Sequence, residues 1–284
     1  MKVLVLGATG MLGNAMLRLF ADSPDFEAVG TARSAGLVAR LPEAVRPLVR
    51  LGVDVDSHDA LVALIARERP DVIINAIGLI KQLADARDPL AALPINAMLP
   101  HRLARLAALA GARLVHVSTD CVFSGRKGGY VETDFPDADD LYGRSKLLGE
   151  VDYPNAVTLR TSIIGCELGS AHALVGWFLA QPGPVKGFRR AVFSGLPTVV
   201  LAEVVRDHVL PRPDMRGLWH VSAAPIDKFT LLSMVRDAWG RDTVIEPSDD
   251  VVIDRSLNSD RFRAATGWHP APWPDLVARM RAFG

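Results

Sequence analysis

The stretch Gly7-Ala8-Thr9-Gly10-Met11-Leu12-Gly13 decides the fold of this chain. It follows a short apolar run, Val3–Leu6, that predicts a buried strand, and it leads into Met11–Ala21, whose pattern predicts a helix. Glycines at such a junction allow a tight turn and let a pyrophosphate approach the positive helix N-terminus. A glycine turn alone is weak evidence, but its place directly after the first strand favours a dinucleotide site. The cofactor residues expected here are Gly7, Thr9, Gly10, Met11, Leu12 and Gly13.

The first half of the chain alternates apolar runs with helical patterns. Near-continuous apolar strands separated by helices are typical of a parallel sheet with helices on both faces. The further strands that we expect are Phe26–Ala32, Val49–Val55, Asp71–Asn75, Arg113–Val117 and Ala156–Leu159. Helices are expected between Ser57 and Pro70, over Ile95–Ala110 and over Tyr142–Glu150. The predicted fold class is α/β, a doubly wound parallel sheet of the Rossmann type.

The second half is less regular and predicts a small, mostly helical cap over the carboxyl edge of the sheet, where open α/β folds bind ligands. One strand, Leu218–Val221, is expected to return to the main sheet. The expected helices are Leu168–Ala180, Leu201–Val209, Phe229–Trp239, Asp260–Thr266 and Pro274–Ala282. We expect a cofactor-binding domain over residues 1–162, with return segments near 195–221, and a substrate-binding cap mainly over residues 163–284.

Composition argues against several classes of function. Lys plus Arg and Asp plus Glu each number 32, so no basic excess recommends a nucleic-acid partner. The two cysteines, Cys121 and Cys166, lack a spacing typical of a disulfide framework or a metal site. No apolar run is long enough to span a bilayer, and the N-terminus lacks a signal-peptide core. We expect a cytoplasmic protein with no membrane segment and no metal.

The end of the second strand distinguishes between the two nicotinamide cofactors. An acidic residue there would bind the ribose 2′-hydroxyl of NAD, but this strand ends in Ala32-Arg33-Ser34. A guanidinium suits the 2′-phosphate of NADPH, because it binds phosphate oxygens through a fork of donors. Arg33 and Ser34 therefore favour NADPH, although an ordinary exposed arginine would have the same sequence. Further cofactor contacts are expected where the third and fourth strands end, at Asp54, Val55, Ala76, Ile77 and Gly78.

Tyr142 and Lys146 are spaced four residues apart, which places a phenol and an ammonium on one face of a helix. Thr119, in the hydroxyl pair Ser118-Thr119, ends the fifth strand. Reduction of a carbonyl group needs a proton donor, and an unperturbed tyrosine, with a pKa of about 10, is too weak an acid at neutral pH. A nearby ammonium lowers that pKa, and Thr119 would orient the carbonyl oxygen. Together these residues predict a carbonyl-reducing site.

Several further stretches agree with this interpretation. They are Val117–Gly125, Tyr142–Glu150, Leu159–Ser162, Gly195–Thr198, and Asn258–Phe262 followed by Gly267-Trp268. With the glycine turn, they make the chain resemble the extended short-chain dehydrogenases, and most of all the dTDP-4-dehydrorhamnose reductase family. The resemblance implies NADPH-dependent reduction of a 4-keto-6-deoxy nucleotide sugar. It makes Tyr142 the proton donor, assigns Lys146 to the nicotinamide ribose, and assigns Thr119 to the ketone.

Two departures from the family pattern concern the residue after Asp120. The reductases usually carry Tyr where this chain has Cys121, and a Cys at this position is similar to bifunctional epimerase/reductases. Those enzymes pair it with a His of the cap helix, and His172 occupies a similar place, so 3,5-epimerisation is an alternative activity. The other interpretation of the pair is a small buried thiol and an ordinary helix residue. Related dehydratases have Glu at the Cys121 position, so dehydration is disfavoured.

Substrate binding and partners follow less directly from the sequence. Ser118 is a candidate for the sugar, and Lys186, Arg189 and Arg190 are candidates for the substrate diphosphate, with a solvated loop as the alternative for these three. Some relatives of this family bind NADP and a partner enzyme without turnover, so a regulatory subunit is a second alternative. The resemblance leaves open whether the chain forms a homodimer.

Overall fold

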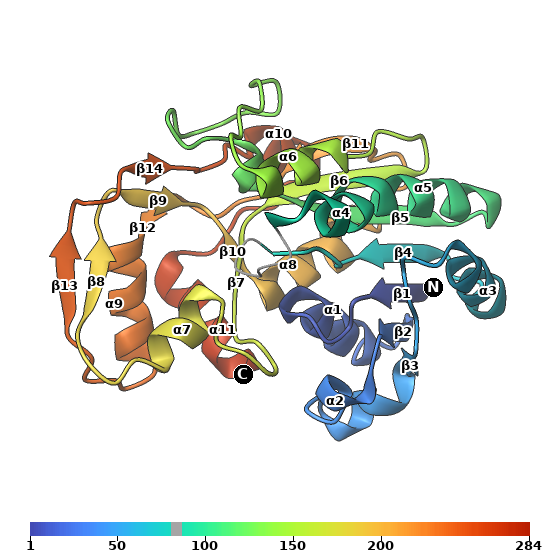
Figure 1. Cartoon of the computed structure of the whole chain (residues 1–284), viewed down its shortest axis with the longest axis horizontal. Coiled ribbons are helices and arrows are strands. Elements are labelled where there is room, and N and C mark those ends of the chain that lie inside the picture. The colour runs from blue at the N-terminus through green and yellow to red at the C-terminus, as the bar shows by residue number, and fades with distance from the viewer. Residues whose placement is uncertain (81–86) are drawn as a thin grey trace.

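The computed structural model describes residues 1–80 and 87–284, and in these ranges a seven-stranded parallel sheet forms the centre of the molecule (Figure 1). The strands lie in the order β11-β6-β5-β4-β1-β2-β3, with every neighbouring pair parallel. Their bounds are β1 Lys2–Leu6, β2 Glu27–Ala32, β3 Val49–Leu51, β4 Val72–Asn75, β5 Arg113–Thr119, β6 Ala156–Thr161 and β11 Gly217–His220. The expected strand near 218–221 thus returns to this sheet as β11.

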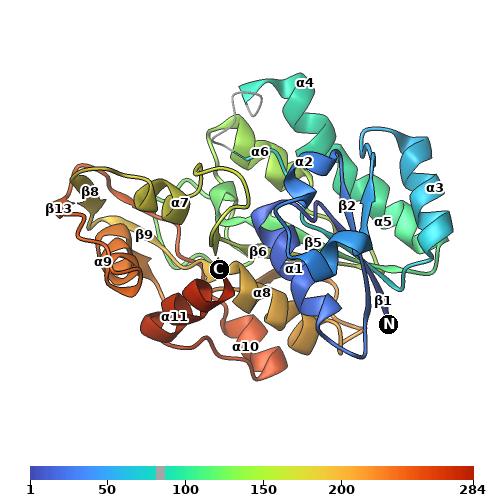
Figure 2. The same cartoon turned by 90° about the horizontal axis from the view of Figure 1, so that it is seen from below.

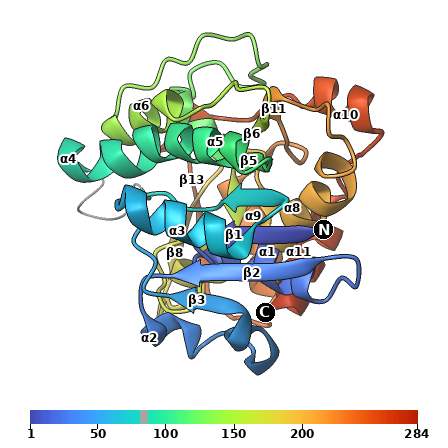
Figure 3. The same ribbon diagram turned by 90° about the vertical axis from the view of Figure 1, so that its right-hand side faces the viewer.

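Helices cover both faces of the sheet, which confirms the doubly wound fold (Figure 3). One face carries α1 (Met11–Ala21) and α8 (Thr198–Val204), and the other carries α3 (His58–Glu68) and α5 (Leu99–Leu109). Further helical segments are α2 Ala35–Val38, α4 Pro89–Ala92, α6 Leu141–Leu148, α10 Asp260–Thr266 and α11 Trp273–Phe283, 3-10 turns at Glu43–Leu48 and Asp120–Val122, and π-helical turns at Leu93–Met98 and Val205–Val209.

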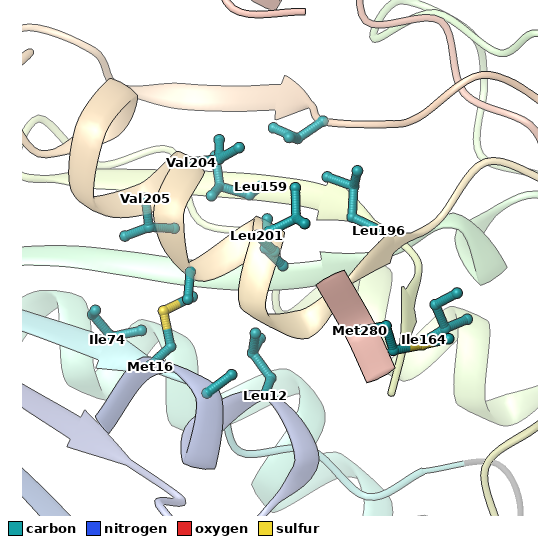
Figure 4. Close-up of a cluster of buried hydrophobic side chains, with 14 of the residues drawn as sticks. Leu12, Met16, Ile74, Leu159, Ile164, Leu196, Leu201, Val204, Val205 and Met280 are labelled. Atoms are coloured by element: carbon teal, nitrogen blue, oxygen red, sulfur yellow. The ribbon is translucent and has the colours of Figure 1, made fainter. Parts of the chain in front are cut away.

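The core on the α1 face explains why this part of the sequence folds as it does (Figure 4). Leu12 and Met16 lie one turn apart on α1 and point toward Leu201 and Val204 of α8, and Leu159 of β6 belongs to the same cluster. All five side chains are buried. Complete burial of an aliphatic side chain contributes about 1.5–3 kcal/mol, so this contact holds the glycine turn against the sheet.

The cap lies beside the carboxyl ends of the sheet strands and mixes helices with short strands (Figure 1 and Figure 2). Its small sheets join strands distant in sequence, with β9 between β12 and β14, and β8 beside β13. The cap elements are α7 Leu174–Leu179, β8 Val185–Phe188, β9 Ala191–Phe193, β12 Ile226–Asp227, α9 Lys228–Ala238, β13 Ile245–Ser248 and β14 Ile253–Asp254. Two short strands, β7 (Ile163–Ile164) and β10 (Leu196–Pro197), pair where the chain enters it. The division at residue 162 stays a prediction.

Among the elements that differ from the prediction, three do so for a clear local reason. The third strand ends at Leu51 instead of Val55, because Gly52 has a positive φ of 73°. The helix expected over Ile95–Ala110 is preceded by further helical turns, which begin at Pro89 because Asp88 Oδ1 accepts the Leu90 N–H at 2.9 Å. The helix expected over Leu168–Ala180 is wrong in its first half, since α7 begins only at Leu174.

Candidate active site

A cavity of about 600 Å³ opens at the carboxyl ends of β1, β4, β5 and β6, between the main sheet and the cap. Its wall contains many of the residues singled out in the sequence. These are Gly10, Met11, Leu12, Ala76, Ile77, Gly78, Ser118, Thr119, Cys121, Tyr142 and Lys146. The fold thus brings together the glycine turn, the end of β4, the end of β5 and helix α6.

The glycine turn is shaped by its close contacts with neighbouring backbone. Gly7 has a φ of +82°, and its carbonyl accepts the Gly10 N–H at 2.9 Å. A Cβ on Gly13 would lie 2.0 Å from the Gly7 oxygen, so only glycine allows α1 to begin this close to the turn. Gly10, the N-cap of α1, and Met11 at its first position line the cavity. The positive end of the helix therefore faces the cavity.

The residues expected at the adenosine end lie outside the wall of this cavity. Arg33 is exposed just beyond β2, and Ser34 is the N-cap of α2. Asp54 is exposed and accepts the Asp56 N–H at 3.0 Å, whereas Val55 is buried. Because β2 and β3 are neighbours in the sheet, these residues follow adjacent strand ends. Gly7, Thr9 and Gly13 also lie outside the cavity wall.

Thr119 and Tyr142 reach the cavity from two elements in tight contact. Thr119 Oγ1 accepts the Cys121 N–H at 3.1 Å and donates to Asp120 Oδ1 at 3.1 Å, so the hydroxyl caps the turn after β5. A Cβ on Gly143 would lie 2.2 Å from the Cys121 oxygen, which shows how closely α6 packs on that turn. Burial raises the pKa of Tyr142, which is the opposite of the lowering expected from a nearby ammonium, and the hydrogen bond with Thr119 opposes that rise. The phenol is therefore protonated at neutral pH.

Lys146, a residue of α6, is buried, with 4% of its surface exposed. Its Nζ donates to the Val117 oxygen at 2.9 Å, next to the strand end that carries Thr119. Burial lowers the pKa of Lys146 to about 8, although Glu150 opposes the shift. The ammonium is thus charged at neutral pH but loses its proton far more easily than an exposed lysine.

Ser118 lines the cavity, yet its hydroxyl is engaged elsewhere. Its Oγ donates to Glu150 Oε1 at 2.7 Å. Arg160 holds the same carboxylate through Nε at 2.7 Å and Nη2 at 2.6 Å, and both members of this ion pair are nearly inaccessible to solvent. The hydroxyl of Ser118 therefore belongs to a buried network behind Lys146.

Cys121 and His172 are placed differently relative to the cavity. Cys121 is in the wall, and burial, followed by the charge of Asp120, raises the pKa of its thiol to about 12. His172 is exposed, precedes α7 and is absent from the cavity wall. The loop that carries it is held by Glu167, whose carboxylate accepts the Ala173 N–H at 2.7 Å. The structure therefore does not bring the two side chains together in the cavity.

The three basic residues considered for the diphosphate are exposed on the cap. Lys186 Nζ lies 2.8 Å from Asp250 Oδ2, and Arg189 forms an ion pair with Asp249. Arg190 is also exposed, and none of the three lines the cavity. Other polar residues line it that the sequence analysis did not single out. They are Asp120, Thr161, Ser162, Glu167, Lys228 and Arg255.

Position in the chain explains why these residues were missed. Asp120 directly follows Thr119, so the strand-end motif could have identified it. Arg255 lies three residues before Asn258 in the tail that the sequence analysis quoted, but nothing local gave it a role. Lys228 begins α9, where Asp227 is the N-cap, and has the sequence context of any helix start. Only the folded cap brings it to the cavity.

Within residues 1–80 and 87–284, no cluster of three or more His, Cys, Asp or Glu side chains could hold a metal ion. None of the helices in those ranges has the length and apolar character needed to cross a membrane.

Comparison with known proteins places the chain among relatives of two kinds. The family model described as the RmlD substrate binding domain matches residues 1–250. Methionine adenosyltransferase 2 subunit beta of Danio rerio is 30% identical over 252 residues, which cover 84% of this chain and 74% of the relative. The dTDP-4-dehydrorhamnose reductase of Aggregatibacter actinomycetemcomitans is 26% identical over an alignment 307 positions long, which covers 99% of each protein.

Solved structures agree on the fold. The dTDP-4-dehydrorhamnose reductase of Bacillus anthracis, crystallised in complex with NADP, superimposes with a TM-score of 0.81 over 100% of this chain and 99% of that chain. Its sequence is 19% identical, so the similarity concerns the fold alone.

Proposed function

The chain belongs to the family of the RmlD substrate binding domain, and we propose that it is an NADPH-dependent reductase of a 4-keto-6-deoxy nucleotide sugar. The observation that carries the proposal is the meeting of Thr119, Tyr142 and Lys146 in one cavity, into which the positive end of α1 also opens. The relative from Aggregatibacter actinomycetemcomitans, which aligns nearly end to end, is named for a reaction of this kind.

The residues present fit NADPH. The cavity wall at Gly10 and Met11 belongs to an eleven-residue helix whose free N–H groups suit a pyrophosphate. Beyond β2, Arg33 is exposed and within the described ranges forms no ion pair, so its guanidinium is available for a 2′-phosphate. When bound, NADPH would supply the hydride.

The side chains at the other end of the cavity supply the proton. Tyr142 is a protonated phenol that can donate its proton to the substrate oxygen. Negative charge develops on that oxygen as the ketone is reduced, and this charge strengthens the hydrogen bond from Tyr142. Thr119 lies beside Tyr142 and would orient the ketone oxygen by a second hydrogen bond when its single hydroxyl proton turns from Asp120 Oδ1 to the substrate. Lys146, four residues along α6, holds the cofactor ribose and favours the phenolate that remains after proton transfer.

Turnover with defined substrates tests the proposal. NADPH consumption is measured with a panel of 4-keto-6-deoxy nucleotide sugars, and at least one is expected to be reduced. Tyr142→Phe should lower kcat by about 10²-fold to 10⁴-fold, the usual contribution of a positioned proton donor, while NADPH binding persists. An unchanged kcat in Tyr142→Phe would show that another group donates the proton.

A second candidate function is that of a subunit of another enzyme. The relative at 30% identity is named methionine adenosyltransferase 2 subunit beta. In this case the protein would bind NADP and a partner enzyme without turnover. Gel filtration with a methionine adenosyltransferase catalytic chain distinguishes the reductase from the subunit. A stable complex, together with no reduction of any sugar in the panel, would favour the function of a subunit.

A further inference from the structure

Two basic side chains line the part of the cavity formed by the cap. Lys228 is the first residue of α9, and Arg255 follows β14. Both belong to the same cavity wall as Thr119, Cys121 and Tyr142. They come from segments far apart in the sequence, which only the folding of the cap brings together.

Neither cation is neutralised by an ion pair within the described ranges. Arg255 is fixed by donation from Nε to the Phe123 oxygen at 2.8 Å, and its Nη1 lies 3.7 Å from Cys121 Sγ. Its Nη2 has no hydrogen bond in residues 1–80 and 87–284, and neither has the ammonium of Lys228. The exposed Lys186 and Arg189 differ, because each is paired with an aspartate.

The acidic residues of the wall do not fully balance these charges. Both oxygens of Glu167 are engaged in its own loop, with Ser170 Oγ at 2.8 Å and the Ala173 N–H at 2.7 Å. Asp120 is buried, and burial raises the pKa of its carboxyl group, with the charge of Arg255 opposing that rise although the two side chains, both within the described ranges, form no ion pair. Burial lowers the pKa of Lys228, with Asp120 and Cys121 opposing this shift, which places all three side chains near one another. Because a partly buried, unpaired cation is costly, a ligand anion would stabilise it.

We propose that Lys228, with Arg255 beside it, binds an oxyanion of the substrate, and that Lys228 determines which substrates the cavity accepts. The inference rests on the proposed function, since it takes the cavity as the substrate site. Two parts of a nucleotide sugar could supply this oxyanion. One is a phosphate oxygen of the diphosphate, and the other is a carboxylate oxygen of an acid group on the sugar. The fixed fork of Arg255 and the point charge of Lys228 can grip one such group from two sides.

The competing explanation is that Lys228 only balances the charge of Asp120. In that case its loss would destabilise the cap and would not change the preference for anions. Lys228→Met removes the charge and keeps the length of the side chain. Lys186→Met is the matched control, because Lys186 is also a lysine of the cap but lies outside the cavity wall.

The experiment is isothermal titration of NADPH-saturated protein with two probes, dTDP and glucuronate. Loss of a charge-assisted contact corresponds to a change in Kd of roughly tenfold to hundredfold. We expect Lys228→Met to weaken at least one probe by that factor, with Lys228→Arg restoring part of it and Lys186→Met having no effect. Weaker binding of dTDP would identify the diphosphate as the partner of Lys228. Weaker binding of glucuronate alone would identify a carboxylate on the sugar as the partner.

Three results would overturn the inference. The first is that wild type and Lys228→Met bind both probes equally well, and the second is that wild type binds neither probe. The third is that Lys228→Met also binds NADPH more weakly and unfolds at a lower urea concentration than wild type. Failure of the proposed function has a different signature. There the wild-type protein would bind a probe through Lys228 and yet reduce no keto sugar.

Discussion

At the scale of single residues, Arg33 is the side chain that we propose selects NADPH over NADH. Its guanidinium is exposed beside Ser34 and forms no ion pair in the described ranges. If it grips the 2′-phosphate, Arg33→Ala should raise the KM for NADPH about tenfold to hundredfold and leave that for NADH nearly unchanged. Steady-state kinetics with both cofactors measure this, with Arg281→Ala, an exposed arginine of α11, as the control. Equal effects on both cofactors would assign Arg33 another role.

Cys121 and His172 bear on the alternative epimerase activity. A buried thiol whose pKa is raised to about 12 and an exposed imidazole outside the cavity are poorly placed to exchange protons at carbon. We therefore expect turnover in deuterated water to place no deuterium on the sugar carbons beside the ketone, as read by mass spectrometry. Deuterium that appears with wild type and disappears with Cys121→Ser would instead establish the epimerase/reductase.

Predictability at this scale depends on whether a residue acts within a local motif. Thr119, Tyr142 and Lys146 belong to a strand end and one helical turn, so their meeting followed from spacing and strand order. Lys228 reaches the same cavity only through the pairing of cap strands such as β9 with β12 and β14. Such pairings join distant segments with little hydrophobic periodicity, and the sequence gives no signal for them.

At the scale of elements, the junction of β1 and α1 tolerates no side chain at Gly13. A Cβ there would lie 2.0 Å from the Gly7 oxygen, and the obstructing group is backbone. Gly13→Ala should therefore destabilise the protein by about 1–3 kcal/mol and weaken NADPH binding. Gly36→Ala in the neighbouring α2 is the matched control, because a Cβ there meets nothing within 4 Å. Urea denaturation compares the two, and equal midpoints would contradict the packing argument.

Elements of the main sheet were predicted closely, and so were helices α9, α10 and α11, whereas α7 and the cap strands were not. Helix α1 begins and ends where its pattern predicted, because both ends are set by local contacts. Helix α7 is shorter than predicted because Glu167 captures the N–H of its N-cap, Ala173, and keeps the preceding residues in a loop. A side chain that binds a backbone N–H in this way competes with helix formation, and the hydrophobic periodicity of the sequence does not indicate it.

At the scale of the whole molecule, a buried polar layer crosses the sheet on the side of α6. His116 and Ser118 of β5 lie in register with Thr158 and Arg160 of β6, and Arg160 lies in register with His220 of β11. All five side chains are buried. Stability of the whole fold should therefore depend on the protonation of the two histidines.

Hydrogen bonds fix both rings in the neutral form. Asn75 Oδ1 accepts the Ile77 N–H, so its amide nitrogen, 3.2 Å from His116 Nδ1, is the donor of that pair. His220 Nδ1 lies 3.0 Å from the Tyr130 oxygen and donates to it, which leaves Nε2 to accept from Arg160 at 3.3 Å. Burial lowers the pKa of both histidines, and the charge of Lys146 lowers that of His116 further.

Because the pKa of each histidine is lowered in the folded protein, we expect the fold to be less stable in mild acid. The unfolded chain takes up a proton on each histidine near pH 6.5, whereas the folded chain does so only at lower pH. The contribution of these histidines to the free energy of unfolding should thus be level above pH 6.5 and fall below it, by at most about 1.4 kcal/mol per pH unit for each buried histidine. Urea titrations at pH 7.5 and 5.5 measure the loss. His116→Gln should reduce the loss, whereas His269→Gln, at an exposed position, should not. An identical pH dependence in wild type and His116→Gln would mean that the folded protein accepts the proton on His116 as readily as the unfolded chain.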